Sequence, residues 1–320
     1  MWVSTIFVIP VWQIADVPTM CDRDECMLEW KMSGLQNGMR EAGRDMKWTI
    51  DSTAELLNGV EMPRLGLGVW RTQEGDEVER AVTAALQAGY RAIDTASMYG
   101  NEAGVGSAVR ASGLPRDSLF ITTKVWNNQQ GYDETLRAFR ESAERLDLGV
   151  VDLYLIHWPV KGKYIDTYRA LEELYDQGLV RALGVSNFHI HHLEDLMGSC
   201  RIKPMVNQVE LHPLLTQKKL QMFCRKEGIQ IESWRPLMLG NLDLPLLREL
   251  SAKYGKTPAQ VVIRWHLQQG IVTIPKSVRP DRIRENADVF DFELEPADMN
   301  RIDALNEDRR FGMDPDHFED

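Results

Sequence analysis

The chain has 320 residues, 43% hydrophobic and 27% charged, which is the composition of a folded globular protein and excludes disorder of the whole chain. Its formal net charge of -11 argues against nucleic-acid and anionic-membrane partners, because basic surfaces hold those. Cys21, Cys26, Cys200 and Cys224 are too scattered for a disulfide framework and no apolar window is long enough to span a membrane, so we expect a cytoplasmic protein.

The start of the chain does not share the pattern of the rest. The opening "MWVSTIFVIPVW" is apolar, but Pro10 interrupts it and no Lys or Arg precedes Arg23, which argues against a signal peptide. We therefore interpret residues 1–45 as an N-terminal extension that is expected to be poorly ordered, with residues 46–320 as the folded domain and Met46 as an alternative start.

From residue 47 onward, short apolar strand-like segments alternate with amphipathic helical segments. Candidate strands lie at 63–70, 91–93, 119–123, 152–156, 181–185, 204–206, 229–233 and 271–274. Apolar residues recur at helical spacing over 136–146 and 168–175. Thr257 followed by Gln260 three residues later predicts a capped helix start.

Eight strand-then-helix units match the size and rhythm of a (β/α)₈ TIM barrel, so we predict an α/β fold with a single barrel domain. An open doubly wound sheet is the alternative, since it uses the same repeat. Its GxGxxG fingerprint is missing, because the glycine pairs at 66 and 68 and at 104 and 106 are followed by Arg71 and Val109 where a third glycine is required.

Polar and aromatic residues follow one candidate strand after another. They are Asp94 and Tyr99, Lys124 and Trp126, His157 and Trp158, Ser186 and Asn187, Asn207 and Gln208, Trp234, and Lys276 and Ser277. Each alone is more often a cap, a turn or a packing residue. Packing has no reason to favour one end of the strands, however, and a barrel places its active site at the carboxyl ends, so the recurrence predicts a shared site.

The residue types after the first strands fit together chemically. A phenol, with a reference pKa of about 10, is a poor proton donor at neutral pH unless a nearby cation stabilises its phenolate. Lys124 can supply that cation for Tyr99, and Asp94 can hold the ammonium in place. His157 can orient a carbonyl oxygen by a hydrogen bond. Such a group is an acid catalyst for a carbonyl that receives a hydride.

Six motifs, in this order, resemble those of the aldo-keto reductase family over about residues 47 to 317. They are "GYRAIDTASMYGNEAGVG", "ITTKVW", "DLYLIHWP", "GVSNF", "NQVELHP" and "TIPKSVRPDRIRENADVFDFEL". The segments "LNGVEMPRLGLGVW" and "RRFGMDPDHF" are most similar to the bacterial glyoxal/methylglyoxal and 2,5-diketo-gluconate reductase group. The resemblance implies NADPH-dependent reduction of small aldehydes and ketones to alcohols.

The resemblance also implies roles for individual residues. It makes Asp94, Tyr99, Lys124 and His157 a catalytic tetrad with Tyr99 as general acid. It implies cofactor binding by Ser186, Asn187 and Gln208 at the carboxamide, by Trp234 at the nicotinamide ring, and by Lys276, Ser277, Arg282 and Asn286 at the 2'-phosphate and adenine end. Arg235 and Leu237, which follow Trp234 in the sequence, are further predicted cofactor-binding residues. Trp70, Trp126 and Trp158 resemble residues that line the substrate pocket.

A basic cluster independently supports a phosphate site. It comprises Lys276, Arg279, Arg282 and Arg284, which stand together in an acidic chain. The alternative is a solvated helix face, since Asp281 and Glu285 are interspersed. One residue departs from the family pattern: Arg235 follows the stacking aromatic, where the family usually has a small residue, so it either reaches the pyrophosphate or displaces Trp234.

Two other functions compete with a reductase. "HIHH", with imidazoles at 189, 191 and 192, would suit a metal-dependent hydrolase, but no carboxylate–histidine pattern recurs at other strand ends, so we expect no metal. A protein that binds NADPH without turnover, as a sensor or interaction partner, is the other alternative, and the filled tetrad weighs against it. We find no exposed heptad or long apolar stripe, so we expect a monomer.

Overall fold

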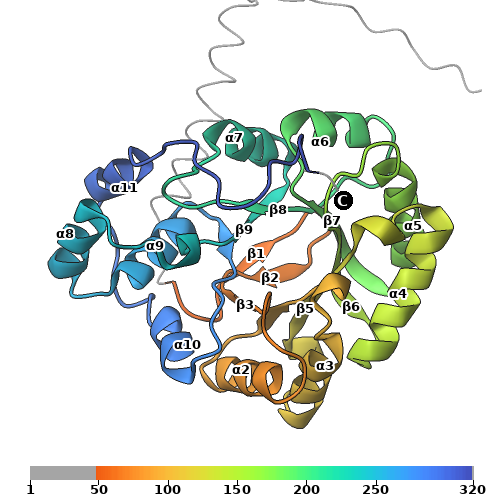
Figure 1. Ribbon diagram of the computed structural model, residues 1–320, viewed down its shortest axis with the longest axis horizontal. Coiled ribbons are helices and arrows are strands. Elements are labelled where there is room, and N and C mark those ends of the chain that lie inside the picture. The colour runs from red at the N-terminus through yellow and green to blue at the C-terminus, as the bar shows by residue number, and fades with distance from the viewer. Residues whose placement is uncertain (1–47, 319–320) are drawn as a thin grey trace, which may run out of the picture. The chain divides into compact units, whose positions relative to one another are not determined.

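Eight parallel strands form the centre of the structure, a computed structural model that describes residues 48–318 (Figure 1). They are β3 (Gly66–Gly68), β4 (Ala92–Asp94), β5 (Phe120–Val125), β6 (Val151–Ile156), β7 (Val180–Ser186), β8 (Val206–Glu210), β9 (Gln230–Trp234) and β10 (Val272–Thr273). Each strand pairs in parallel with its neighbour in chain order. Every predicted strand segment overlaps one of them.

The two edges of this sheet meet and close it into a barrel. Parallel bridges join Leu65 to Thr273 and Gly68 to Lys276 across the seam. Gly68 is needed there, because a Cβ at this position would lie 2.9 Å from the carbonyl oxygen of Ile274. The predicted barrel is therefore confirmed, and the open doubly wound sheet is wrong because an open sheet leaves its edge strands apart.

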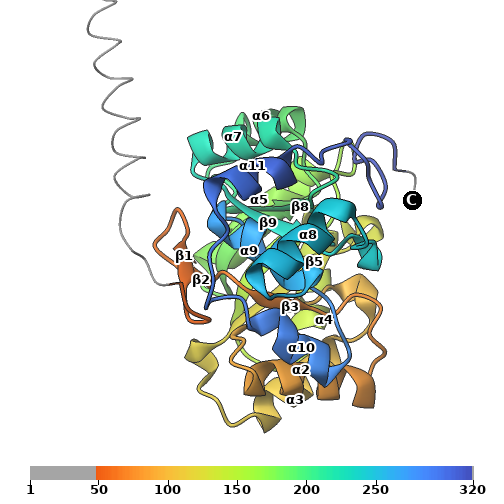
Figure 2. The same cartoon turned by 90° about the vertical axis from the view of Figure 1, so that its left-hand side faces the viewer.

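A helix follows every strand of the barrel and packs outside it, as Figures 1 and 2 show. These helices are α2 (Asp76–Gln87), α3 (Glu102–Ala111), α4 (Tyr132–Leu146), α5 (Tyr164–Asp176), α6 (Ile190–Met197), α7 (Lys218–Glu227), α9 (Pro258–Gln268) and α10 (Pro280–Ala287). Two more helices interrupt the repeat, α8 (Pro245–Tyr254) before α9 and α11 (Pro296–Asp303) after α10. Within residues 48–318 no helix is both long and apolar enough to cross a bilayer.

The predicted helix signals are confirmed. The apolar stripes at 136–146 and 168–175 lie in α4 and α5. Thr257 begins α9 with the predicted capping box, in which its hydroxyl oxygen accepts from the backbone N–H of Gln260 at 3.3 Å and the Gln260 side chain accepts from the backbone N–H of Thr257 at 2.8 Å. This arrangement satisfies donors that a helix start leaves free.

A short antiparallel hairpin, not predicted from the sequence, closes the amino end of the barrel. Its strands are β1 (Thr53–Glu55) and β2 (Glu61–Pro63). Ala54 and Met62 are buried in one apolar cluster with Leu153 and Leu155 inside the barrel. Three-residue strands are too short to show an alternating pattern, which is why the sequence did not reveal them. The hairpin leaves the opposite, carboxyl end of the barrel for the site.

The predicted extension, residues 1–45, lies outside the described residues, so both its lack of order and the domain boundary at residue 46 stay predictions.

Candidate active site

A buried ion pair lies at the carboxyl ends of β4 and β5. The Lys124 ammonium is fully buried and lies 2.7 and 2.8 Å from the two carboxylate oxygens of Asp94. It also donates to the carbonyl oxygen of Thr95 at 2.8 Å. Burial lowers the pKa of Lys124, but the Asp94 carboxylate outweighs this and the pKa is raised overall. The ammonium is therefore a fixed positive charge beneath the site.

Tyr99 lies beside this charge, in the 3₁₀ turn Ser97–Tyr99 that follows β4. The Lys124 nitrogen is 5.1 Å from the centre of the Tyr99 ring. Burial raises the pKa of Tyr99 to about 12, and the Lys124 charge opposes that rise. The phenol consequently holds its proton at neutral pH, while the adjacent cation favours the phenolate once that proton leaves.

His157, directly after β6, completes this group. Its ring meets the Tyr99 ring edge-on with the centroids 5.7 Å apart, and the Trp126 ring at 4.9 Å. Burial first, and the Lys124 charge second, hold the pKa of His157 well below its ordinary value, so the imidazole is neutral. A neutral imidazole has one N–H to donate, which suits a hydrogen bond to a carbonyl oxygen.

One cavity of about 1170 Å³ brings the predicted residues together. Every predicted catalytic, cofactor and pocket residue except Lys124 lines it: Trp70, Asp94, Tyr99, Trp126, His157, Trp158, Ser186, Asn187, Gln208, Trp234, Arg235, Leu237, Lys276, Ser277, Arg282 and Asn286. Lys124 lies beneath the wall, fully buried. The carboxyl ends of different strands thus converge on one site, as the sequence predicted.

Three side chains, those of Ser186, Asn187 and Trp234, hold the wall of this cavity in place. The Ser186 hydroxyl donates to the carbonyl oxygen of Gln208 at 2.8 Å. The Asn187 amide donates to the carbonyl oxygen of His157 at 2.9 Å, and its own side-chain oxygen accepts from the Trp234 indole N–H at 2.9 Å. These bonds tie together the ends of β6, β7, β8 and β9, so the orientation of the Trp234 ring is fixed.

Glu232, in β9, is a buried acid of the site that the sequence analysis missed. The Gln208 amide nitrogen donates at 2.7 Å both to Glu232 and to Asp94, and so links two carboxylates near one ammonium. Burial, followed by the Asp94 charge, raises the pKa of Glu232 to about 8. The only signal for Glu232 in the sequence is that an acidic residue stands within an otherwise strand-like segment.

The basic cluster is divided by the structure. Lys276, Arg279 and Arg282 line the cavity, whereas Arg284 does not. Arg279 forms an ion pair with Asp281 at 2.5 Å. Among residues 48–318 Arg282 has no ion-pair partner, so its charge is available to a ligand. Three of the four predicted basic residues therefore reach the cavity, and Arg284 does not, because residues two apart on a helix point in different directions.

Arg235 lies between two aromatic rings of the cavity. Its guanidinium carbon is 4.7 Å from the centre of the Trp70 ring and 5.0 Å from that of Trp234. Two of its nitrogens, Nε and Nη1, are buried and have no hydrogen-bond partner within residues 48–318. Unpaired buried donors on a cation suit an anionic ligand group, and the stacking on Trp234 preserves the position of that ring.

The C-terminal segment, defined as residues 309–318, supplies another part of the wall that was not predicted. Phe311, Gly312 and Met313 line the cavity. The Glu210 carboxylate accepts from the backbone N–H groups of Phe311 at 2.7 Å and Gly312 at 2.9 Å. A Cβ at position 312 would lie 2.4 Å from Trp234, so only glycine lets the segment approach this closely.

A (β/α)₈ barrel with this cavity and buried group at its carboxyl end matches one family. The sequence model of the Aldo/keto reductase family matches residues 64–307, so the chain belongs to that family. Among its relatives, glyoxal reductase of Bacillus subtilis is 57% identical over 274 residues, covering 85% of this chain and 99% of the relative. Methylglyoxal reductase DkgA of Salmonella typhimurium is 48% identical over 268 residues, covering 82% and 96%.

A solved structure supports the same assignment. It is a Gox0644 mutant in complex with NADPH, 46% identical to this chain with a TM-score of 0.80, and the match covers 84% of this chain and 99% of that one. The predicted family is confirmed by these comparisons.

Proposed function

We propose that this chain is an NADPH-dependent reductase of small aldehydes and ketones with Tyr99 as the general acid. The observation that carries this proposal is the buried Lys124 ammonium, held by Asp94 beside the Tyr99 ring at the floor of the cavity. The relatives glyoxal reductase and methylglyoxal reductase support small dicarbonyl compounds as first substrates. The resemblance of the terminal segments to the 2,5-diketo-gluconate reductase group makes that compound a further candidate.

The roles of the residues follow from their positions. NADPH, when bound, supplies a hydride to the carbonyl carbon. Tyr99 donates its proton to the carbonyl oxygen, and the Lys124 charge stabilises the phenolate that remains. Asp94 holds the ammonium in place, and the neutral imidazole of His157 donates a hydrogen bond that positions the carbonyl oxygen.

The donors around the cavity fit a dinucleotide phosphate. Cationic side chains at Lys276 and Arg282 suit the 2'-phosphate, with Ser277 and Asn286 beside them, and the unpaired nitrogens of Arg235 suit the pyrophosphate. At the nicotinamide end, the proposed contacts are Ser186, Asn187 and Gln208 to the carboxamide, the Trp234 ring to the nicotinamide face, and Leu237 beside the chain between the two ends. A volume of about 1170 Å³ leaves room for the cofactor and a small substrate.

The substrate end of the cavity is largely aromatic. Trp70, Trp126 and Trp158 line it, and the Trp126 ring packs against His157. Aromatic walls exclude water from the reacting carbonyl, which strengthens the hydrogen bonds that polarise it.

We also propose that the protein works as a cytoplasmic monomer.

The test is oxidation of NADPH by the full chain, followed by the loss of nicotinamide absorbance, with methylglyoxal first and other small carbonyls next. We expect steady consumption of NADPH that the metal chelator EDTA does not change. Absence of NADPH consumption together with a hydrolytic activity that EDTA abolishes would favour the metal-dependent hydrolase. Tight binding of NADPH without turnover of any carbonyl would favour the sensor.

Arg282→Ala should weaken binding of NADPH by roughly tenfold or more, since a hydrogen bond to a charged group contributes about 1.5–3 kcal/mol. Binding of NADH, which has no 2'-phosphate, should change little. The measurement is the Kd of each cofactor by fluorescence titration. Arg284→Ala is the matched control, because this arginine is on the same helix but does not line the cavity. Equal losses for both cofactors in Arg282→Ala would place the 2'-phosphate elsewhere.

A further inference from the structure

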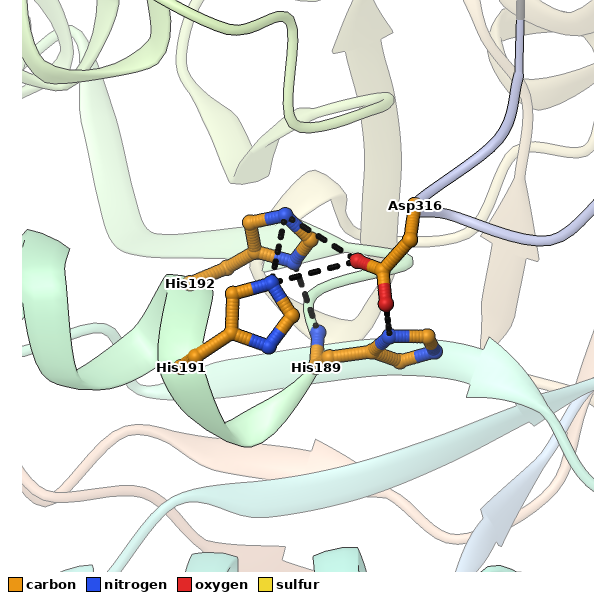
Figure 3. Close-up of side chains that lie close together, drawn as sticks. All are labelled: His189, His191, His192 and Asp316. Carbon is orange, nitrogen blue, oxygen red and sulfur yellow. Dashed lines mark hydrogen bonds and ion pairs between the residues drawn. The ribbon is translucent and has the colours of Figure 1, made fainter.

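Three imidazoles and one carboxylate converge outside the cavity (Figure 3). His189 is the residue before α6, and His191 and His192 lie in the first turn of that helix. Asp316 belongs to the C-terminal segment, far away in the sequence. In Figure 3 the carboxylate points into the space between the three rings. The proposed reductase chemistry uses none of these four residues.

The four side chains lie close enough together to become the ligands of one tetrahedral metal ion. Zn²⁺ binds imidazole nitrogen and carboxylate oxygen at about 2.0–2.2 Å, so neighbouring ligand atoms of a tetrahedron lie about 3.3–3.6 Å apart. Here one Asp316 oxygen lies 3.0 Å from His189 Nδ1, and the other lies 3.1 Å from His191 Nε2 and 3.5 Å from His192 Nε2. The last two nitrogens are 3.2 Å apart.

We infer that His189, His191, His192 and Asp316 form a Zn²⁺ site that fastens the C-terminal segment to α6. Three imidazoles and one carboxylate are ligands that zinc accepts, and a donor set rich in imidazole nitrogen favours zinc over ions that prefer six oxygen ligands. All four ligand atoms lie within 4.8 Å of one another.

Zinc would replace a set of hydrogen bonds at this place. Arg310 donates to His189 Nε2 at 3.0 Å, and the backbone N–H of His189 donates to His192 Nδ1 at 3.2 Å. Coordination through His189 Nδ1 and His192 Nε2 moves the ring proton to the other nitrogen of each ring and ends both bonds. Arg310 keeps a partner nearby, because Asp314 lies 3.6 Å away.

Fastening this segment has a consequence for the cavity. Asp316 is three residues beyond Met313, and Phe311, Gly312 and Met313 line the cavity. In the structure the Glu210 carboxylate already holds the backbone at 311 and 312. A metal at Asp316 adds a second fixed point, so it restrains the wall beside Trp234.

The first experiment is calorimetric titration of the full chain with Zn²⁺, in a Cys21→Ser/Cys26→Ser background because thiolates also bind zinc. We expect one equivalent to bind, and His191→Asn and Asp316→Asn to weaken binding by roughly tenfold or more. His191 is exposed, so its replacement should leave folding intact. His317→Asn is the matched control, because this exposed histidine stands in the same segment but outside the cluster. The affinity of this variant for Zn²⁺ should equal that of the parent.

Hydrogen exchange tests the fastening itself. Zn²⁺ should slow exchange of the amides in residues 309–318 in the parent protein and in His317→Asn, and should have no effect in Asp316→Asn. The inference is overturned by an absence of zinc binding, by equal affinity in the parent and His191→Asn, or by exchange rates that zinc does not change. None of these readouts depends on turnover, so their failure and that of the proposed reductase activity are distinguishable.

Discussion

Tyr99→Phe should lower kcat for methylglyoxal by about 10²–10⁴-fold, which is the contribution of a positioned general acid. The substitution removes only the hydroxyl. The ring therefore keeps its contacts with His157 and with the Lys124 charge, and the Kd of NADPH should stay within about twofold of the parent value. The measurements are steady-state turnover and fluorescence titration of NADPH on the same preparation.

The control for this prediction is Tyr132→Phe. This substitution likewise removes only a phenol hydroxyl, which in Tyr132 donates a hydrogen bond to the Glu173 carboxylate. Tyr132 is exposed and does not line the cavity. Its kcat should match the parent. The raised pKa of Tyr99, about 12, also means that the acid form persists into mildly alkaline pH, so Tyr99 causes no loss of turnover there. Full turnover by Tyr99→Phe would show that another group donates the proton.

The barrel was predictable because it repeats one local pattern. Each strand is short, apolar and followed by a helix whose buried stripe recurs every three or four residues, so errors in one unit are corrected by the others. The β1–β2 hairpin and the C-terminal segment have no such repetition. Their positions depend on single tertiary contacts, such as Met62 inside the barrel and Glu210 with the backbone at 311 and 312, which no local pattern records.

The site was predictable to the extent that its residues follow strands. Asp94, Lys124 and His157 were found because each directly follows a candidate strand. Glu232 was missed because it stands within β9 and belongs to the site only through its bond from Gln208 on the neighbouring strand β8. Arg284 was wrongly grouped with Arg282, since the sequence does not show which side of α10 faces the cavity.

Lys124→Met should lower both turnover and stability, because the same buried charge serves both. The long apolar side chain fills the space but leaves the Asp94 carboxylate buried without a counter-ion, next to a second acid at Glu232. Breaking a buried pair in this way costs about 3–5 kcal/mol of the free energy of unfolding. That loss should appear in urea denaturation, and kcat should fall at least as far as in Tyr99→Phe, since the phenolate loses its stabilising cation.

The double variant Asp94→Asn/Lys124→Met separates the two effects. An amide at position 94 carries no charge, so the energetic cost of the missing ammonium largely disappears and the free energy of unfolding should recover by a few kcal/mol. Turnover should not recover, because a neutral pair supplies no positive charge beside Tyr99. Regained turnover together with stability would mean that Lys124 acts only by holding the fold, and the proton donor would then have to work without a cation.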